Sequence, residues 1–316
     1  MPGKSKKIIA VLGPTASGKS TLAVYLAKKL CTEGSKRKYR IEGSEIISAD
    51  SRQVYRLLDV YSNKIKPQEM HDIPHHLLDI ASPRRTFTVS HYQRHATKII
   101  NRLIQQNKIP ILCGGTGFYI DAVLHDISFP AVPPQPTLRK NLSQKPSEEL
   151  FRLLKKHDPE RAKTIDHHNP HRLIRALEIV LTTGKPVPSI HKGSPYEYLK
   201  IGISSPKETL KERIEKRLIR IINNGSAIEE VQQLHDKYKI TWKHFERLGM
   251  GYRFIAEYLQ GFSDKKTMQE KIIKAEMDYV KRQMTWFRKD SSIIWVDTPQ
   301  KAFAILQDFL SPEVLS

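Results

Sequence analysis

Short apolar runs alternate with amphipathic stretches through the first part of the chain. The run from Ile8 to Leu12 is continuously apolar and enters a glycine-rich turn, and leucines then recur at four-residue spacing over residues 20–30. Two further runs that are mostly apolar, and that we predict to be strands, occupy residues 45–49 and 109–113. Fully apolar strands that alternate with helices are typical of a parallel sheet covered by helices on both faces. The pattern therefore predicts an α/β fold.

The pattern changes after about residue 126. Four prolines follow within about ten residues, and the next segments have helical spacing with weak strand signals. One helix is well delimited, because Asn169 suits its N-cap, Pro170 its first turn and Gly184 its end. An apolar run over residues 198–203 then resumes the strand pattern. We expect the chain to divide into a first core part over 1–125, a helical insertion over 126–196 and a second, mostly helical core part over 197–316.

The pattern after residue 203 is mostly helical. One helix carries an apolar stripe, with its arginines on another face; the stripe consists of Leu210, Ile214, Leu218 and Ile221. A later helix is expected over about 275–289. The polar segment 33–44 is bounded by glycines and basic, so we expect it to form a surface loop.

The glycine-rich turn is the most specific motif in the chain. Its sequence, GPTASGKS, joins a predicted strand to a predicted helix, which is the context that a phosphate-binding P-loop requires. Backbone amides and the lysine bind phosphate oxygens in such a loop, and its last serine can ligate Mg²⁺. The motif fits a diphosphate as well as a triphosphate, and it indicates a P-loop NTPase-like core. Its residues are Gly13, Pro14, Thr15, Ala16, Ser17, Gly18, Lys19 and Ser20.

Other charged and polar residues are expected near this loop. Asp50 and Thr116 follow the second and third apolar runs, and parallel strands end at one edge of the sheet. The Asp50 carboxylate could act as a general base, support a metal or cap the next helix. Arg213 and Arg217 lie one helical turn apart, so they could clamp a phosphate or simply be solvated. No acidic residue ends the run 109–113, which weakens the interpretation as an ordinary NTPase.

Composition limits the partners and the metal sites. The 316 residues include 53 Lys and Arg against 33 Asp and Glu, so the formal charge is +20; this favours a polyanionic partner, with a solubility role as the alternative. Two cysteines can form neither a disulfide framework nor a four-thiolate zinc site, which suits the cytoplasm. Prolines interrupt the histidine groups at 71–76 and 167–171, so we expect no structural zinc. No apolar run reaches membrane-spanning length, so we expect a soluble protein.

Motifs along nearly the whole chain resemble one enzyme family. The ordered set resembles the tRNA dimethylallyltransferases in their bacterial form. The P-loop is widely shared, whereas the order and content of the whole set are specific. The motifs are GPTASGKS at 13–20, ISADSRQVY at 47–55, PHHLLDI at 74–80, GGTGFY at 114–119, NPHRLIRALE at 169–178, GMGYR at 249–253 and KRQMTWFR at 281–288.

This resemblance implies a reaction and roles for particular residues. A dimethylallyl group passes from dimethylallyl diphosphate to the exocyclic amine of the adenosine just 3′ of the tRNA anticodon, and diphosphate is released. The P-loop with Lys19 and Arg213 holds the diphosphate, and the Thr15 hydroxyl lies near the bridging oxygen of the breaking bond. Asp50 takes the amine proton, and Arg217 stabilises the departing diphosphate. Mg²⁺ is the implied cofactor, with Ser20 as its protein ligand.

The resemblance also implies which residues contact tRNA. The insertion over 126–196 binds the anticodon arm, and the target adenosine leaves its stack to reach the site. Arginines suit phosphates, whereas Gln53 and Thr116 suit base edges. A monomer is expected, because one anticodon arm fits one site. The implied positions are Asp50, Ser51, Arg52, Gln53, Thr116, Arg139, His171, Arg172, Leu173, Ile174, Arg175, Leu248, Gly249, Met250, Gly251, Tyr252 and Arg253.

Two alternatives remain open at the level of sequence. A P-loop nucleotide or small-molecule kinase would have nearly the same N-terminal pattern, but it would not explain the charge or the NPHRLIRALE element. A non-catalytic RNA-binding protein could have kept the fold. The intact Gly13, Lys19, Ser20 and Asp50 argue against a loss of catalysis.

Overall fold

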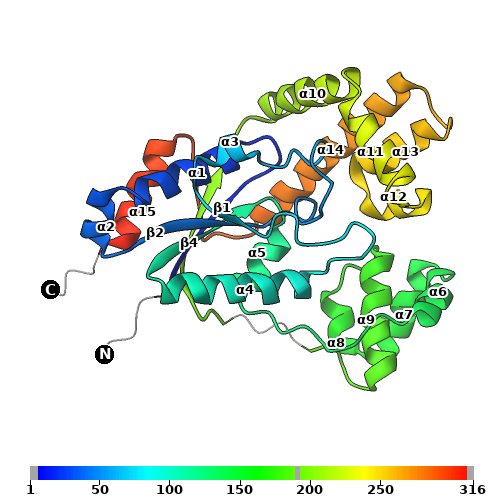
Figure 1. Ribbon diagram of the computed structural model, residues 1–316. Coiled ribbons are helices and arrows are strands. Elements are labelled where there is room, and N and C mark those ends of the chain that lie inside the picture. Colours follow the sequence, from blue (N-terminus) through cyan, green and yellow to red (C-terminus); the bar gives the residue numbers. More distant parts are fainter. Residues whose placement is uncertain (1–5, 189–192, 312–316) are drawn as a thin grey trace. The chain divides into compact units, whose positions relative to one another are not determined.

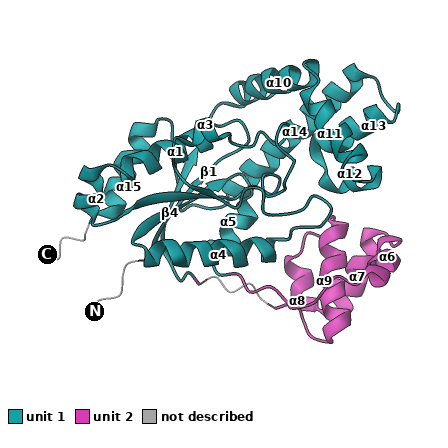
Figure 2. Cartoon of the chain, viewed as in Figure 1, with its two compact units in different colours: residues 1–126, 194–316 teal, residues 127–193 magenta. Residues whose placement is uncertain are grey.

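The computed structural model describes residues 6–188 and 193–311, and the chain divides into two compact units (Figure 1, Figure 2). Unit 1 comprises residues 1–126 and 194–316, and unit 2 comprises residues Ile127–Gly193. The segment expected as a helical insertion includes unit 2. Residues 1–5, 189–192 and 312–316 of the expected parts lie outside the described residues. Within the described ranges, no helix is long and apolar enough to span a membrane.

Unit 1 is built on a parallel sheet of six strands in the order β3-β2-β4-β1-β5-β6. All four apolar runs identified in the sequence form strands, which confirms the predicted α/β class. The central strand β1 is buried on both faces, as its uninterrupted apolar sequence requires. The strands are β1 (Lys7–Leu12), β2 (Gly43–Ser48), β3 (His75–His76), β4 (Lys108–Gly114), β5 (Glu197–Ile203) and β6 (Ile293–Val296).

Helices cover both faces of this sheet. Ile9 and Val11 of β1 pack with α1 (Lys19–Leu30) and α15 (Pro299–Leu310) on one face. Ile8 and Ala10 pack with α4 (Val89–Gln105) and α5 (Gly117–Leu124) on the other. The alternation follows the two-residue period of a strand. The short helices α2 (Glu33–Tyr39) and α3 (Pro67–Met70) belong to the connections around β2.

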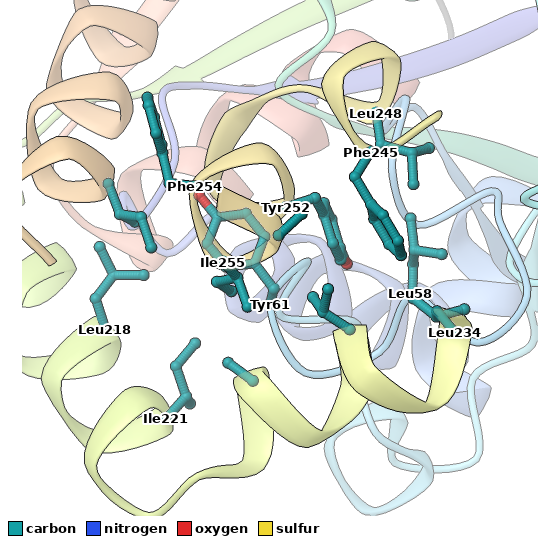
Figure 3. Packing of buried hydrophobic residues seen from close by; sticks show 14 of the residues in the cluster. Leu58, Tyr61, Leu218, Ile221, Leu234, Phe245, Leu248, Tyr252, Phe254 and Ile255 are labelled. Atoms are coloured by element: carbon teal, nitrogen blue, oxygen red, sulfur yellow. The ribbon is translucent and has the colours of Figure 1, made fainter. Parts of the chain in front are cut away.

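A second hydrophobic core of unit 1 is helical (Figure 3). Its helices bury the predicted stripe of α10, and the segment around Leu58 and Tyr61 packs against them. Tyr61 and Tyr252 meet edge to face with their ring centroids 4.9 Å apart. The helices are α10 (Lys207–Asn223), α11 (Ser226–Asp236), α12 (Trp242–Leu248), α13 (Met250–Leu259) and α14 (Lys265–Phe287).

Unit 2 is a small helical unit with its own core. Leu150 and Leu154 of α7 pack against Leu173 and Leu177 of α9. The predicted limits of α9 are confirmed: the Asn169 side chain accepts from the Arg172 amide at 3.2 Å, and the helix ends at a glycine in the left-handed conformation. The helices are α6 (Pro136–Ser143), α7 (Ser147–His157), α8 (Pro159–Thr164) and α9 (Pro170–Thr183).

Two local expectations were wrong. The segment 33–44 contains α2, which Thr32 caps by accepting from the Ser35 amide at 3.3 Å. That helix buries none of its residues, so it leaves no apolar period in the sequence. Helix α14 begins at Lys265, well before residue 275, because Asp264 caps it. The histidines at 75–76 form a short strand, in which His76 pairs with Glu45 of β2 at 2.6 Å.

Candidate active site

The turn between β1 and α1 has the geometry of an anion cradle. Gly18 precedes the helix with a φ of 92°, a left-handed conformation that favours glycine. The first amides of α1 are unpaired within the helix and carry its positive dipole end. Lys19 folds back so that its Nζ donates to the Pro14 carbonyl at 3.2 Å. Burial lowers the pKa of Lys19, whereas the neighbouring Asp50 carboxylate raises it. The turn therefore concentrates hydrogen-bond donors and positive charge at one point.

Asp50 lies directly after β2, at the same edge of the sheet. Its Oδ1 accepts from the backbone amides of Arg52 at 2.8 Å and Gln53 at 3.2 Å. No helix begins here, because residues 51–54 form a turn, so the helix-capping alternative is wrong and the bonds instead close that turn through one of the two carboxylate oxygens. These bonds fix the side chain in a cavity that it shares with Lys19. A fixed carboxylate of this kind can also accept a proton from a ligand.

One cavity joins these groups. Its volume is about 970 Å³, and four residues of the expected catalytic set line it, namely Thr15, Lys19, Asp50 and Arg217. Ser20, Gln53 and Arg213 also line it. The cavity extends past the P-loop along α1, where exposed lysines continue its wall. Residues far apart in the sequence therefore form one concave, cationic site.

The two arginines of α10 differ in their surroundings. Arg213 is exposed, and its Nη1 donates to the Ala16 carbonyl of the P-loop at 3.2 Å. The Arg217 side chain is 14% exposed, and its Nη2 lies 3.6 Å from Oε2 of Glu276. The buried Nε of Arg217 has no hydrogen-bond partner among the described residues. Buried donors normally find a partner, so this guanidinium is suited to an anionic ligand.

Gln283 of α14 braces the site and was not identified from the sequence. Its Oε1 accepts from the Thr15 amide at 2.9 Å, and its Nε2 donates to the Gly115 carbonyl at 2.8 Å. The side chain is buried, so both groups need these partners. The bonds connect the P-loop to the end of β4. Gln283 lies within KRQMTWFR, and that motif is the signal that could have identified it.

The ends of β2 and β4 are also joined directly. Thr116 donates from its amide to the Ala49 carbonyl at 3.2 Å, and its hydroxyl accepts from the Ser51 amide at 3.1 Å. The strands approach so closely that a Cβ on Gly114 would lie 2.1 Å from the Ala49 oxygen. Glycine is therefore required at this position. The expected convergence of Asp50 and Thr116 at one edge is confirmed.

The expected tRNA-contacting positions of unit 1 fall into different environments. The side chains of Leu248 and Tyr252 are buried in the helical core, and the contact of these positions with tRNA stays a prediction. Gly251 is buried against Tyr61. Gln53 uses its amide nitrogen to donate to the Asn63 carbonyl at 3.1 Å. The other expected positions are partly or fully exposed: Ser51, Arg52, Thr116, Gly249, Met250 and Arg253.

The expected positions of unit 2 divide in the same way. The Leu173 side chain belongs to the core of the unit and Ile174 packs partly against that core, so contact of these two positions with tRNA stays a prediction. Nε and Nη2 of Arg139 each donate to the buried Glu178 at 2.7 Å, and Arg175 also pairs with Glu178. His171 and Arg172 are exposed in the first turn of α9.

The site has few protein ligands for a metal. Within the described residues, no group of three His, Cys, Asp or Glu side chains could hold a metal ion. Ser20 is exposed and lines the cavity with Asp50. Mg²⁺ commonly takes one or two protein oxygens and completes its octahedron with phosphate oxygens and water. These residues therefore fit Mg²⁺ only together with a bound diphosphate.

Comparisons with known proteins agree on one family. Residues 53–290 match the family model described as IPP transferase. The tRNA dimethylallyltransferase of Natranaerobius thermophilus is 37% identical over 301 residues, which cover 93% of this chain and 87% of that protein. The enzyme of the same name from Synechococcus elongatus is 36% identical over 313 residues and 97% of both chains. The crystal structure of the tRNA isopentenylpyrophosphate transferase from Bacillus halodurans has a TM-score of 0.71 at 31% identity and covers 97% of both chains.

Proposed function

The chain belongs to the IPP transferase family, and from this we propose that it is a tRNA dimethylallyltransferase. It transfers a dimethylallyl group from dimethylallyl diphosphate to the exocyclic amine of the adenosine 3′-adjacent to the anticodon, and it releases diphosphate. One observation carries the proposal: a single cavity holds the P-loop, Lys19, Asp50 and Arg217. These are the groups that the transfer needs, namely an anion cradle, a base and a cation for the leaving group.

The cradle binds the diphosphate of the prenyl donor. Amides at the start of α1 and the Lys19 ammonium face its oxygens, while Gln283 holds the Thr15 amide in place. The Thr15 hydroxyl lies toward the bridging oxygen of the breaking bond. Arg213 reaches the loop from α10 and adds a second cation. The cradle thus carries a prenyl diphosphate, where related loops carry a nucleotide.

Proton removal is assigned to Asp50. The exocyclic amine is a weak nucleophile because its lone pair is delocalised into the adenine ring. As its nitrogen forms a bond to the allylic carbon, the carbon–oxygen bond breaks and the diphosphate leaves with the electron pair. Asp50 accepts the amine proton, with its orientation set by the Arg52 and Gln53 amides.

Charge on the leaving group is stabilised by Arg217. Its guanidinium lines the cavity and has a buried donor without a partner among the described residues. A cation fixed in a mostly buried site interacts strongly with charge that develops on the departing oxygen. Mg²⁺ would be held by Ser20 and the diphosphate oxygens, and when bound it would neutralise part of that charge.

The tRNA is bound by exposed cations of both units. Unit 2 is proposed to bind the anticodon arm, with His171 and Arg172 of α9 available for phosphates. In unit 1, the exposed Arg253 and the partly exposed Arg52 are the corresponding cations. The target adenosine is flipped out of its stack into the cavity. The formal charge of +20 supports a polyanionic substrate. The enzyme is proposed to act as a cytoplasmic monomer.

The position of the modification is the direct test of the substrate. Purified protein is incubated with dimethylallyl diphosphate, Mg²⁺ and an unmodified tRNA transcript, and the tRNA is digested and its nucleosides are analysed by mass spectrometry. A matched transcript carries guanosine in place of the adenosine 3′ of the anticodon. Prenylated adenosine from the first transcript alone is expected. Equal modification of both transcripts, or of neither, would contradict the assigned substrate.

A further inference from the structure

Arg217 is held by a carboxylate that the reaction itself does not use. Glu276 of α14 is 3% exposed, and its Oε2 lies 3.6 Å from the Arg217 Nη2. This separation is an ion-pair distance and exceeds that of a good hydrogen bond. Glu276 therefore attracts the guanidinium without occupying its donors at close range. The donors stay available to a ligand, while the attraction favours this position of the side chain.

The other oxygen of Glu276 leads away from the cavity. Its Oε1 accepts a hydrogen bond from the Tyr61 hydroxyl at 2.6 Å, and that hydroxyl accepts from the Gly251 amide at 2.9 Å. Tyr61 is itself fixed, because Glu230 accepts from its backbone amide at 3.2 Å. A continuous chain of contacts therefore runs from Gly251 through Tyr61 and Glu276 to Arg217.

The backbone around Gly251 is shaped for this contact. A Cβ on Gly251 would lie 2.2 Å from the Tyr61 ring, so no larger residue fits without displacement. The Tyr252 ring packs edge to face on Tyr61, as Figure 3 shows. Burial raises the pKa of Tyr61 well above its ordinary value, and the nearby Glu276 carboxylate raises it further. The hydroxyl therefore keeps its proton and donates a hydrogen bond to Glu276.

We propose that Glu276 is a positioning residue for the transfer, which fixes the Arg217 guanidinium at the diphosphate and links it through Tyr61 to the Gly251 backbone. The inference rests on the proposed function and deepens it. Gly251 lies in the segment 249–253, which carries the exposed Arg253 proposed to meet tRNA. In this proposal, binding of tRNA to this segment influences the position of the Arg217 guanidinium through Tyr61 and Glu276.

The two contacts of Glu276 predict a specific kinetic effect. Loss of the charge in Glu276→Gln leaves the hydrogen bond from Tyr61 possible but removes the attraction for Arg217. Misplacement of a catalytic group by about 1 Å costs up to about a hundredfold in rate. We expect kcat to fall by about ten- to a hundredfold with KM for tRNA nearly unchanged. Tyr61→Phe keeps the ring and removes only the hydroxyl, so we expect a smaller loss of about three- to tenfold.

A double-mutant cycle separates positioning from a general effect on structure. Single-turnover transfer to tRNA is measured for Glu276→Gln, Arg217→Ala and the double variant, with Glu270→Gln on the exposed side of α14 as the matched control. If Glu276 acts through Arg217, its substitution adds less than about a twofold loss in the Arg217→Ala background. A general structural effect would persist undiminished in that background and would overturn the proposal.

The remaining outcomes are also decisive. Wild-type kcat in Glu276→Gln would overturn the positioning role and leave the proposed transferase activity intact. An inactive wild-type protein would instead contradict the proposed function. If Glu276→Gln does not fold, the same cycle is run with Tyr61→Phe. Wild-type kcat in Tyr61→Phe would overturn the proposal. An equal loss of transfer rate from Tyr61→Phe in the wild-type and the Arg217→Ala backgrounds would also overturn it.

Discussion

Two buried glutamates, one in each unit, hold arginines in different ways. In unit 2, Glu178 is fully buried, and both Nε and Nη2 of Arg139 bind it at 2.7 Å. In unit 1, Glu276 is almost as buried, but its Oε2 lies 3.6 Å from Nη2 of Arg217, and a buried nitrogen of that arginine has no partner among the described residues. The first arrangement uses the donors of its arginine for the fold. The second leaves them for a ligand.

The abundance of cations in this chain does not by itself identify its binding sites. Fifty-three Lys and Arg cannot all mark binding sites, and sequence spacing alone treats Arg175 and Arg217 alike. The two arginines differ in what their hydrogen-bond donors bind. Arg175 bonds to Glu178 and donates to the Val132 carbonyl at 3.0 Å, so it stabilises unit 2 directly. Arg217 is expected to matter for chemistry more than for stability.

The largest expected effect is on the chemistry of unit 1. Asp50→Ala removes the proposed base, and we expect transfer to fall by about 10²- to 10⁴-fold while tRNA affinity is largely kept. The exposed Asp308→Ala on α15 is the matched control. Single-turnover rates and tRNA dissociation constants are the measurements. An unchanged rate in Asp50→Ala would contradict the assignment of Asp50 as the base.

The next effect is on the stability of unit 2. Glu178→Ala leaves Arg139 and Arg175 without their shared carboxylate, and we expect local stability to fall by about 2–4 kcal/mol, below the cost at fully buried pairs because both arginines are more than a third exposed. Hydrogen exchange should show lost protection in α9 and unchanged protection in β1 and β4. Equal loss in all three elements would mean that unit 2 does not unfold by itself.

The stability that Glu178 gives to unit 2 should depend on pH. Burial alone would raise the pKa of Glu178, but hydrogen bonds from Arg139, the Gln135 amide and Arg175 outweigh it and lower the pKa from its ordinary value of 4.5 to about 2. The stabilisation is therefore complete above about pH 4.5 and is lost as the pH falls toward 2. Exchange in α9, corrected for intrinsic rates, should rise over this window. A Glu178→Gln variant should lack that acid dependence, and retention of it would assign the effect to another group.

The smallest effect concerns two arginines of one helix. Arg172 is exposed in α9, whereas Arg175 is committed to Glu178. We expect Arg172→Ala to lower the salt slope of tRNA binding by about one with α9 protection unchanged. Arg175→Ala should lower α9 protection and change the slope less. A slope change of about one in Arg175→Ala would show that an arginine held by Glu178 also meets phosphate, and the division drawn here would fail.

Much of the fold could be predicted because buried positions give a regular pattern of apolar residues in the sequence. The strand β1 is buried on both faces, so its sequence is continuously apolar, and parallel strands bring Asp50 and Thr116 to one edge. Helix α2 buries nothing and has no such pattern. Position in a motif also assigned Tyr252 to RNA contact, although its ring fills the helical core. A motif match indicates that a residue is important, but it does not indicate whether the side chain or the backbone of that residue is responsible.

The contacts that organise the site could not be predicted for a different reason. Gln283 meets Thr15 across 268 positions of sequence, and Glu276 meets Arg217 from another helix. The spacing of apolar residues along one helix does not predict which of its other faces lies at a cavity that it shares with a second helix. These partners are set by the packing of α10 and α14 in the helical core, which only the folded chain reveals.

This P-loop is proposed to carry a prenyl diphosphate, where related loops carry a nucleotide. The most direct test incubates the protein, Mg²⁺ and unmodified tRNA in parallel with labelled dimethylallyl diphosphate and with labelled ATP, and follows the label into nucleosides and free phosphates. We predict prenylated adenosine and released diphosphate from the first donor, and no transfer or hydrolysis from ATP. Phosphate transfer or hydrolysis from ATP without prenylated adenosine would contradict the claim and favour the kinase.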